Sequence, residues 1–324
     1  MNNKLNICQV SLLGNIPIIK KNYYNFKKIY KDINLFIIVP KKNKKTFRQK
    51  LNFKDIYIID EEHIINFSTF KKISNKYLKN TIYFKDIQKR LGWYYQQILK
   101  ISFIYNFIEK RKENIIIWDA DTIIIKKINF FNRNISNIHG TTSYFHKAYY
   151  ETNKSILKKL PPYYISSLAQ FISITPLEQK FLKKKLSQNR KVGKNFSETL
   201  THIVMQTISR VHKKYNGSLF SEYELIGQSN LLFNYQKQIL VSGMRDHLNG
   251  QLNYFQTKIL FILGFKYIAY EHTHPNINSK NMLKRNQTWF QFIKLLIKKL
   301  SNNIYRGLKH HINYFLNLFV PALR

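Results

Sequence analysis

The segment IIIWDADTIII, at residues 115–125, constrains the fold more than any other part of the chain. Runs of isoleucine on both sides suit strands that are covered on both faces, as in a parallel sheet. Ionised carboxylates are costly in such surroundings unless a cation or hydrogen-bond donors meet them. The segment therefore predicts a buried strand whose carboxyl end places Asp119 and Asp121 beside a cation or hydrogen-bond donors.

The segments before this strand alternate between strand and helix patterns. Apolar runs at residues 4–13, 34–39 and 55–60 predict strands, and the apolar spacing at 18–30 predicts a helix after the first. A second helical stripe covers residues 93–108, shortly before the central strand. Such alternation is typical of parallel sheets of the nucleotide-binding type, whose ligands lie at the carboxyl ends of the strands.

The second half of the chain has weaker strand signals. Residues 143–227 indicate helices and loops, with helices expected at 175–186 and 196–212, and the run YIAY at 267–270 predicts a last strand. We therefore expect an α/β fold with a mixed, mainly parallel sheet, a helical middle region and a C-terminal basic amphipathic helix.

Length and composition exclude several classes of protein. A chain of 324 residues can bury a core, and its single cysteine, Cys8, rules out an intramolecular disulfide and a cysteine-rich metal site. No stretch approaches the roughly 20 apolar residues that cross a bilayer, and the N-terminus lacks the pattern of a secretory signal. We expect a cytoplasmic protein without membrane-spanning segments.

The net charge of +37, from 54 Lys and Arg against 17 Asp and Glu, attracts anions of every kind. Lysine is spread along the chain together with asparagine and isoleucine, as codon bias in an AT-rich coding sequence produces. No helix-turn-helix, RNP or zinc-finger pattern accompanies the charge. We expect no specific nucleic-acid partner, and we expect the charge to attract anionic lipid and nucleotide phosphates.

Two aspartates in a turn are weak evidence when taken alone, because a structural cap has the same pattern. The context is more specific. Acids at the carboxyl end of a buried strand, with a further apolar strand after them, are the setting in which nucleotide-sugar transferases of the GT-A type hold Mn²⁺ or Mg²⁺. A hard cation held by carboxylates offsets the charge that develops on a nucleoside diphosphate as it leaves.

Four segments in order carry a resemblance: GWYYQQILK at 92–100, WDADT at 118–122, HKAYYET at 146–152 and FSEYELIG at 220–227. Together they resemble an uncharacterised family of bacterial proteins that are similar to GT-A glycosyltransferases and tend to be linked with surface-polysaccharide synthesis. The resemblance implies a GT-A-like domain at 1–275, with a donor half at about 1–140 and an acceptor half at about 141–275.

The resemblance also implies roles for single residues on the donor side. Asp119 and Asp121 would bind the metal and the nucleotide sugar, with Asp121 as the direct ligand. Trp93, Gln97 and Lys100 would lie next to the donor, where Lys100 would meet a phosphate. The alternatives that remain open are an exposed lysine on a basic helix and a structural role for the glutamine.

Glu222 and Glu224 form a local acid pair in a chain that is poor in acids. A loop with this spacing would present Glu222 as the general base that deprotonates an acceptor hydroxyl, with Glu224 structural or acceptor-binding. Two solvated loop acids are the alternative.

Three further residues are candidates for the acceptor site and one for the metal. His146, Tyr150 and Glu151 would line the acceptor groove, because aromatic faces stack on sugars and polar tips bind hydroxyls. His272 follows the last predicted strand, where GT-A enzymes often supply a further metal ligand. A structural histidine and a solvated loop are the respective alternatives.

Residues 276–324 predict a basic amphipathic tail. Apolar residues follow one helical stripe while lysines and arginines mostly occupy other faces, a form that lies in a membrane interface and is attracted to anionic lipid. An ordinary helix packed on the core is the alternative. The stripe consists of Ile293, Leu296, Leu300, Ile304, Leu308, Ile312, Phe315 and Phe319.

The sequence favours a metal-dependent glycosyltransferase that passes a sugar from a nucleotide-sugar donor to a glycan or lipid-linked acceptor. Two other functions stay open: a non-catalytic, membrane-associated nucleotide-binding module, and a Mg²⁺-dependent phosphoryl-transfer enzyme, because paired aspartates also serve nucleases and phosphatases. A phosphatase of the aspartyl-phosphate type would carry its acids after the first strand, and no Walker A loop supports an ATPase.

Overall fold

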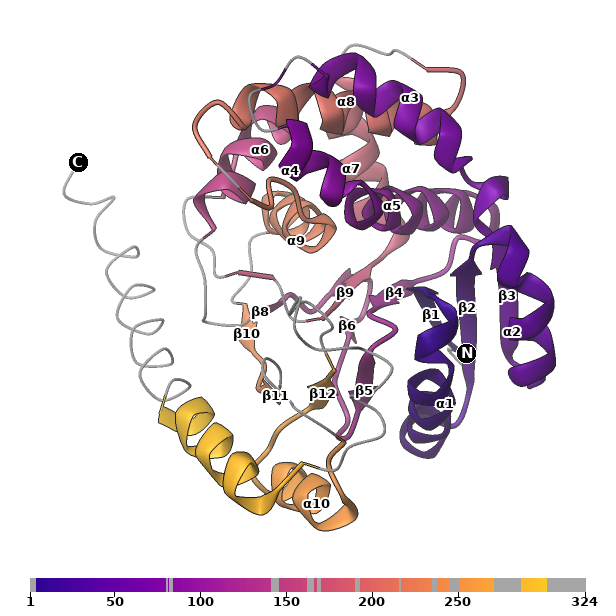
Figure 1. The fold of residues 1–324 in the computed structure, drawn as a ribbon, viewed down its shortest axis with the longest axis vertical. Helices are drawn as coiled ribbons and strands as arrows, with labels where there is room; N and C mark the ends of the chain where they lie inside the picture. The colour runs from indigo at the N-terminus through magenta and orange to yellow at the C-terminus, as the bar shows by residue number, and fades with distance from the viewer. Residues whose placement is uncertain are drawn as a thin grey trace.

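The computed structural model describes residues 4–79, 81, 84–140, 146–161, 166–167, 170–189, 193–215, 217–234, 238–244, 251–270 and 287–301. Within them a central sheet separates a thick helical layer from a thinner layer on the other face (Figure 1).

The central sheet has the strand order β3-β2-β1-β4-β9. Four strands are parallel and the edge strand β9 is antiparallel to β4, which confirms the predicted α/β fold with a mixed, mainly parallel sheet. The strands are β1 (Leu5–Val10), β2 (Ile33–Val39), β3 (Ile56–Asp60), β4 (Ile115–Trp118) and β9 (Phe171–Ile174).

Alternate residues of the strands pack against different helices, which explains their continuous apolar runs. Cys8, Phe36 and Ile117 belong to the core under α5 (Leu91–Arg111). Ile7, Leu35 and Ile116 belong to a second core with α1 (Ile16–Tyr30) and α2 (Lys44–Lys50).

The thick layer contains the helices of the middle region. Side chains of Asn66, Thr175, Asn195 and Ser221 accept backbone hydrogen bonds at the first turns of α3, α7, α8 and α9. The helices expected at 175–186 and 196–212 are confirmed. The layer is made of α5 together with α3 (Phe67–Leu78), α4 (Phe84–Lys89), α6 (Lys147–Leu157), α7 (Pro176–Ser187), α8 (Phe196–Val211) and α9 (Glu222–Phe233).

The sequence prediction was wrong at two places in this region. The segment FSEYELIG was expected to be a loop, but it opens the buried helix α9, because Ser221 caps the helix by accepting a hydrogen bond from Glu224 N at 3.4 Å. The middle region was also expected to have little sheet, yet Phe171–Ile174 completes the central sheet as β9.

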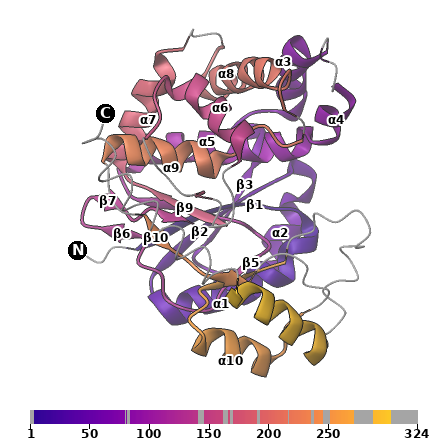
Figure 2. The ribbon, with the colours of Figure 1, turned by 90° about the vertical axis from the view of Figure 1, so that its left-hand side faces the viewer.

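A small second sheet, in the order β11-β12-β5, continues from the central strand. It consists of β5 (Thr122–Ile124), β11 (Gly243–Met244) and β12 (Tyr267–Ala269), the last confirming the strand predicted there. Helix α10 (Tyr254–Ile262) and a helix at 289–301 lie below it (Figure 2). Short elements complete the description: η1 (Leu13–Asn15), η2 (Lys41–Asn43), η3 (Glu61–His63), β6 (Phe131–Asn132), β7 (Ile135–Ser136), β8 (His139–Gly140) and β10 (Ile239–Leu240).

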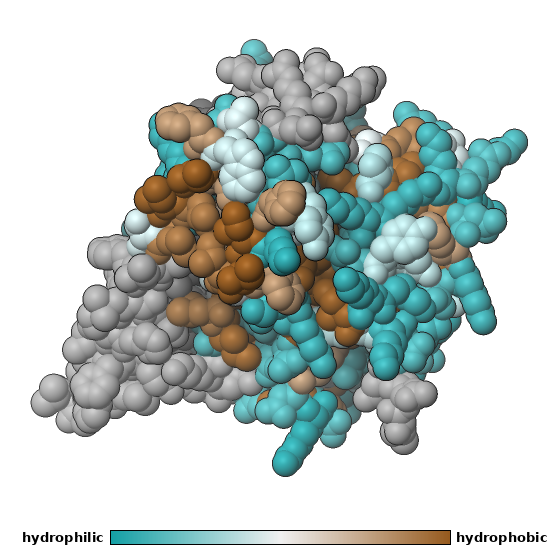
Figure 3. All heavy atoms as spheres, turned by 90° about the horizontal axis from the view of Figure 1, so that it is seen from below, coloured by the Kyte–Doolittle hydropathy of each residue, from teal (hydrophilic) through white to brown (hydrophobic). Residues whose placement is uncertain are grey.

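The helix at 289–301 divides the stripe that the sequence predicted. Phe292 and Leu295 are buried, and Leu296 and Leu300 pack against them, whereas Ile293 is exposed. Figure 3 shows this end of the molecule, where hydrophobic side chains reach the surface among hydrophilic ones. The rest of the predicted stripe, from residue 302 onward, lies outside the described residues. Among the helices of the described chain, none has the length and apolar character to cross a membrane.

Candidate functional site

Asp119 and Asp121 lie in the tight turn between β4 and β5, where backbone contacts fix their positions. The carbonyl of Asp119 accepts from Thr122 N at 3.1 Å, and the carbonyl of Asp121 accepts from Tyr270 N at 2.9 Å. The Thr122 hydroxyl donates to Asp121 Oδ1 at 3.2 Å, and the Trp118 indole N–H donates to Thr122 O at 2.8 Å. These hydrogen bonds fix the turn, and the turn holds both carboxylates at the carboxyl end of the central strand β4.

Lys100 joins this turn to α9. Its Nζ donates hydrogen bonds of 2.6 Å to Asp119 Oδ1 and 2.6 Å to Glu222 Oε1, and one of 3.3 Å to the hydroxyl of Tyr223. The side chains of Lys100 and Glu222 are only 3 % and 4 % exposed, whereas that of Asp119 is 24 % exposed. Lys100 is thus not the exposed lysine that the sequence left open as an alternative, and Glu222 is not a solvated loop acid.

The charges in this site do not balance. Burial lowers the pKa of Lys100, but Asp119 and Glu222 raise it more, so the lysine stays protonated. Burial and the nearby charge of Asp119 raise the pKa of Asp121 to about 7. Burial also raises the pKa of Glu222, an effect that Lys100 opposes. The raised pKa values show that the site favours added positive charge, and a divalent cation would supply that charge in place of protons.

The residues present fit such a cation in their chemistry. Asp119 and Asp121 offer the hard oxygen ligands that Mg²⁺ and Mn²⁺ bind, and Mg²⁺ in particular is commonly held by one or two carboxylates together with substrate phosphates. Within the described residues no three His, Cys, Asp or Glu side chains gather closely enough to form an all-protein metal site. His272, the third predicted ligand, lies outside the described residues.

Glu224 faces different partners from Glu222, although both lie in the first turn of α9. It accepts hydrogen bonds from Ser166 Oγ at 2.6 Å and from Gln228 Nε2 at 3.3 Å. Burial raises its pKa to about 7. These contacts tie Glu224 to the packing around α9.

Gln97 also positions α9. Its Oε1 accepts from the backbone N–H of Glu222 at 3.0 Å, and its Nε2 donates to the carbonyl of Trp93 at 3.3 Å. Gln97 is buried, and its role is to hold the backbone at the start of α9. Trp93 lines the neighbouring cleft, whereas Gln97 does not.

A cleft of about 830 Å³ lies at the carboxyl ends of β1, β2 and β3. Its walls are the segments 10–15 and 40–43, which follow β1 and β2, together with Glu61, Phe67 and the first turns of α5. Cys8 of β1 lies opposite Ile117 of β4 in a parallel register, which brings the end of β1 beside Asp119. The cleft and the acid site therefore occupy adjacent positions along the same sheet edge.

The predicted acceptor residues lie on α6. His146 precedes the helix, and its ring centre lies 3.9 Å from that of Tyr149, whose hydroxyl donates to Ser218 Oγ at 2.7 Å near the start of α9. Tyr150 instead packs against Ile138 and Leu231, and Glu151 is half-buried. The structure thus brings His146 toward the acid site through Tyr149 and places Tyr150 in a separate cluster.

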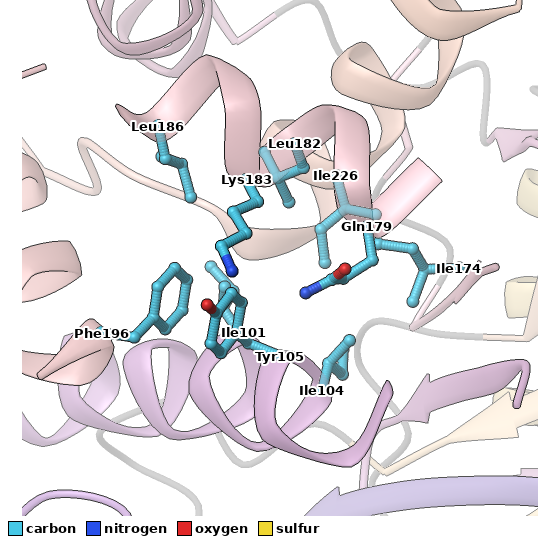
Figure 4. Close-up of a pocket in the computed structure, with 10 residues that line it drawn as sticks. All are labelled: Ile101, Ile104, Tyr105, Ile174, Gln179, Leu182, Lys183, Leu186, Phe196 and Ile226. Carbon is cyan, nitrogen blue, oxygen red and sulfur yellow. The ribbon is translucent and has the colours of Figure 1, made fainter. Parts of the chain in front are cut away.

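A second hollow, between α5, α7 and α8, is too small for a substrate. Its volume is about 10 Å³, and apolar side chains such as Ile101, Leu182 and Phe196 surround it (Figure 4). Gln179 Nε2 is buried there and has no hydrogen-bond partner among the described residues. The space admits at most one water molecule.

The fold and the site define an α/β protein with an acidic centre at the carboxyl end of a central parallel strand. The chain belongs to the DUF6492 family, a family of unknown function, whose sequence model matches residues 15–241. No curated protein matches the chain.

Two solved structures are similar at low identity. Mouse xyloside xylosyltransferase 1 has 11% identity and a TM-score of 0.41, with 84% of this chain and 99% of that chain covered. The galactosyltransferase LgtC, in complex with donor and acceptor sugar analogs, has 10% identity and a TM-score of 0.42, with 90% and 95% covered. Similarity at this level does not establish a function for this protein, so its function has to be inferred from the residues of the site.

Sequence reasoning missed several residues around the site. The polar segments after β1 and β2, including Ser11, Asn15 and Lys42, line the cleft but were not singled out. Their position directly after predicted strands was an available signal. The pattern Ser-x-x-Glu at 221–224 likewise indicates a helix start.

Proposed function

We propose that this protein is a glycosyltransferase with a GT-A-like core, which moves a sugar from a nucleotide-sugar donor to an acceptor hydroxyl with the help of Mn²⁺ or Mg²⁺. One observation carries the proposal. Asp119 and Asp121 follow the carboxyl end of β4, and the end of the neighbouring strand β1 lines a cleft of about 830 Å³, which is a volume typical of ligand sites. Paired carboxylates beside such a cleft suit a metal-bound diphosphate.

The donor would occupy the cleft. Phe67 and Trp93 offer aromatic surface to a base, and Lys42 offers a positive charge to phosphate. Asp119 and Asp121 would hold the cation, which offsets the negative charge that develops on the leaving diphosphate. Lys100 adds a buried positive charge next to the same carboxylates.

Glu222 is the residue that we propose as the general base. When an acceptor hydroxyl attacks the anomeric carbon, the bond to the diphosphate oxygen breaks and the hydroxyl proton has to be accepted. Lys100 holds one oxygen of Glu222, and burial raises the pKa of this carboxyl, which makes its carboxylate a stronger base. Glu224, tied to Ser166 and Gln228, would keep α9 in place.

The base assignment has its own test. Glu222→Gln should fold, bind donor and lose turnover, and any residual activity should no longer depend on pH in the acidic limb of the profile. Wild-type turnover in this variant would remove the assignment. Glu109→Gln, on the far turn of α5 in an exposed ion pair with Lys183, is the matched control and should keep wild-type turnover.

The acceptor would approach from α6. The half-buried ring of His146, which stacks on the buried Tyr149 near the start of α9, would contact the acceptor, because sugars stack on such rings. Tyr150 and Glu151, one turn into the same helix, would contact parts of the acceptor farther from the reacting hydroxyl. A glycan or lipid-linked acceptor of surface-polysaccharide synthesis in bacteria fits the resemblance of the four segments.

We also propose that residues 1–275 form the catalytic domain, divided near residue 140 into donor and acceptor halves, and that 276–324 form a basic tail. His272, near the end of this domain, would be a further metal ligand. The protein would work in the cytoplasm, on the inner face of the membrane, because its excess of lysine attracts anionic lipid.

Thermal unfolding with a panel of nucleotide sugars, with and without Mn²⁺, tests the proposal. One donor should raise Tm only when Mn²⁺ is present, and Asp121→Ala should lose this rise while Glu109→Gln keeps it, because a ligand that binds only the folded state stabilises it. No shift with any donor, or the same shift in Asp121→Ala, would count against the donor site.

A further inference from the structure

The end of the molecule that carries α10 and the helix at 289–301 has an unusual surface. Large apolar side chains point into solvent from both helices, where a soluble surface ordinarily carries them singly. Phe255 is 67% exposed and Phe290 is 78% exposed. The exposed apolar residues here are Tyr254, Phe255, Phe261, Ile262, Leu263, Trp289, Phe290, Ile293 and Ile297, and we call them the apolar face.

The two helices form one unit. Gln256 Nε2 donates to the carbonyl of Gln287 at 3.0 Å, and the N–H of Gln287 donates to the carbonyl of Gln251 at 2.9 Å. Leu260 and Phe292 share one buried cluster between the helices. The inner sides of both helices thus pack on each other and on the sheet, and the apolar face takes no part in this packing among the described residues.

The charge around the apolar face has a single sign. Lys258, Lys294 and Lys298 are exposed on the same two helices, and Lys126 Nζ lies 5.0 Å from the ring centre of Phe261. Segments 251–270 and 287–301 contain no Asp or Glu. Figure 3 shows the hydrophobic side chains next to hydrophilic ones on this side.

We propose that the apolar face, together with these lysines, docks on an anionic lipid bilayer. Aromatic and aliphatic side chains enter the boundary between headgroups and acyl chains, while lysines stay at the level of the anionic headgroups. A second copy of this chain fits less well, because it would bring two lysine-rich surfaces together.

Docking on a membrane would also influence which acceptor reaches the acid site. Ile123 and Ile125 pack into the same cluster as Leu260 and Phe292, and β5 begins directly after Asp121. One strand therefore links the docking surface to the acid site. If the proposed glycosyltransferase function holds, this position favours an acceptor that is anchored in the membrane over a free glycan.

Vesicle flotation of the full-length protein tests the docking surface without any donor or metal. Wild type should float with vesicles of phosphatidylcholine and phosphatidylglycerol and bind pure phosphatidylcholine far more weakly. The double variant Phe255→Ser/Phe290→Ser should bind the anionic vesicles about tenfold or more weakly, because it removes two large apolar side chains from the interface.

The matched control is Tyr24→Ser/Leu177→Ser, which removes two exposed apolar side chains from α1 and α7 and should float as wild type does. Equal flotation of the Phe255→Ser/Phe290→Ser variant and wild type would overturn the proposal. So would a dimer, seen by sedimentation without vesicles, that the same variant abolishes. Asp121→Ala should float normally, so a failure of the glycosyltransferase function is distinguishable from a failure of docking.

Discussion

Lys100 Nζ donates a hydrogen bond of 2.6 Å to Glu222 Oε1, which connects the middle of α5 to the first turn of α9. The same ammonium binds Asp119 at the end of β4. Three segments that are far apart in the sequence therefore meet at the buried ammonium group of Lys100. Such a cluster is costly to assemble, because each ion loses its hydration, so it adds little net stability compared with a well-packed apolar cluster.

Removal of the lysine should leave two carboxylates without their shared partner. Lys100→Met is expected to lower the free energy of unfolding by about 3–5 kcal/mol, measured by urea unfolding at neutral pH without metal. Lys183→Met, which breaks the exposed pair with Glu109, should cost about 1 kcal/mol or less. A cost for Lys100→Met no larger than that of Lys183→Met would contradict the buried-cluster account.

Glu224 should make stability depend on pH. Its pKa rises from 4.5 in the unfolded chain to about 7 in the folded protein, so the folded state binds the proton more tightly. Wild type should therefore lose up to about 3 kcal/mol between about pH 4.5 and pH 7 from this group, and no more above that range.

Glu224→Gln removes this dependence, so its stability relative to wild type should improve as pH rises through the same window. Glu109→Gln is the contrasting variant, because hydrogen bonds from Lys183 and Tyr105 lower the pKa of Glu109 and reverse the sign. The measurement is thermal unfolding of wild type and Glu224→Gln at a series of pH values. If the stability of both proteins changes with pH in the same way, Glu224 is not buried as described.

Two glycines should respond to alanine in opposite directions. A Cβ at Gly227 in α9 would lie 2.2 Å from Ser167 Oγ and 2.7 Å from Ser167 Cβ, whereas a Cβ at Gly92 in α5 would meet nothing within 4 Å. Gly227→Ala is expected to destabilise the protein by about 1–3 kcal/mol. Gly92→Ala should stabilise it by up to about 1 kcal/mol, because alanine favours the helix. Equal effects in chemical denaturation would contradict the close packing of α9.

The elements that the sequence predicted well have strong local signals. The apolar run of β2, the isoleucine run of β4 and the stripe of α5 are regular, so the parallel sheet and the helix before Asp119 followed from spacing alone. The placement of both aspartates at a strand end followed from the same pattern.

Other features depend on contacts between distant segments. The strand β9 has four residues, and only its pairing with β4 separates it from a buried loop. The burial of Lys100 depends on Asp119 and Glu222 meeting it from two other elements, which no spacing within α5 reveals. The start of α9 was missed although the Ser-x-x-Glu pattern was present, because the clustered acids suggested a loop that presents a general base.

The most direct test of the glycosyltransferase proposal is to identify which bond of a nucleotide sugar the purified protein breaks. We predict that, with Mn²⁺, one donor of the panel yields a nucleoside diphosphate and free or transferred sugar, detected by ³¹P NMR, and that Asp121→Asn abolishes this release. Release of nucleoside monophosphate and sugar phosphate would show cleavage within the diphosphate, and would contradict glycosyl transfer in favour of phosphoryl transfer.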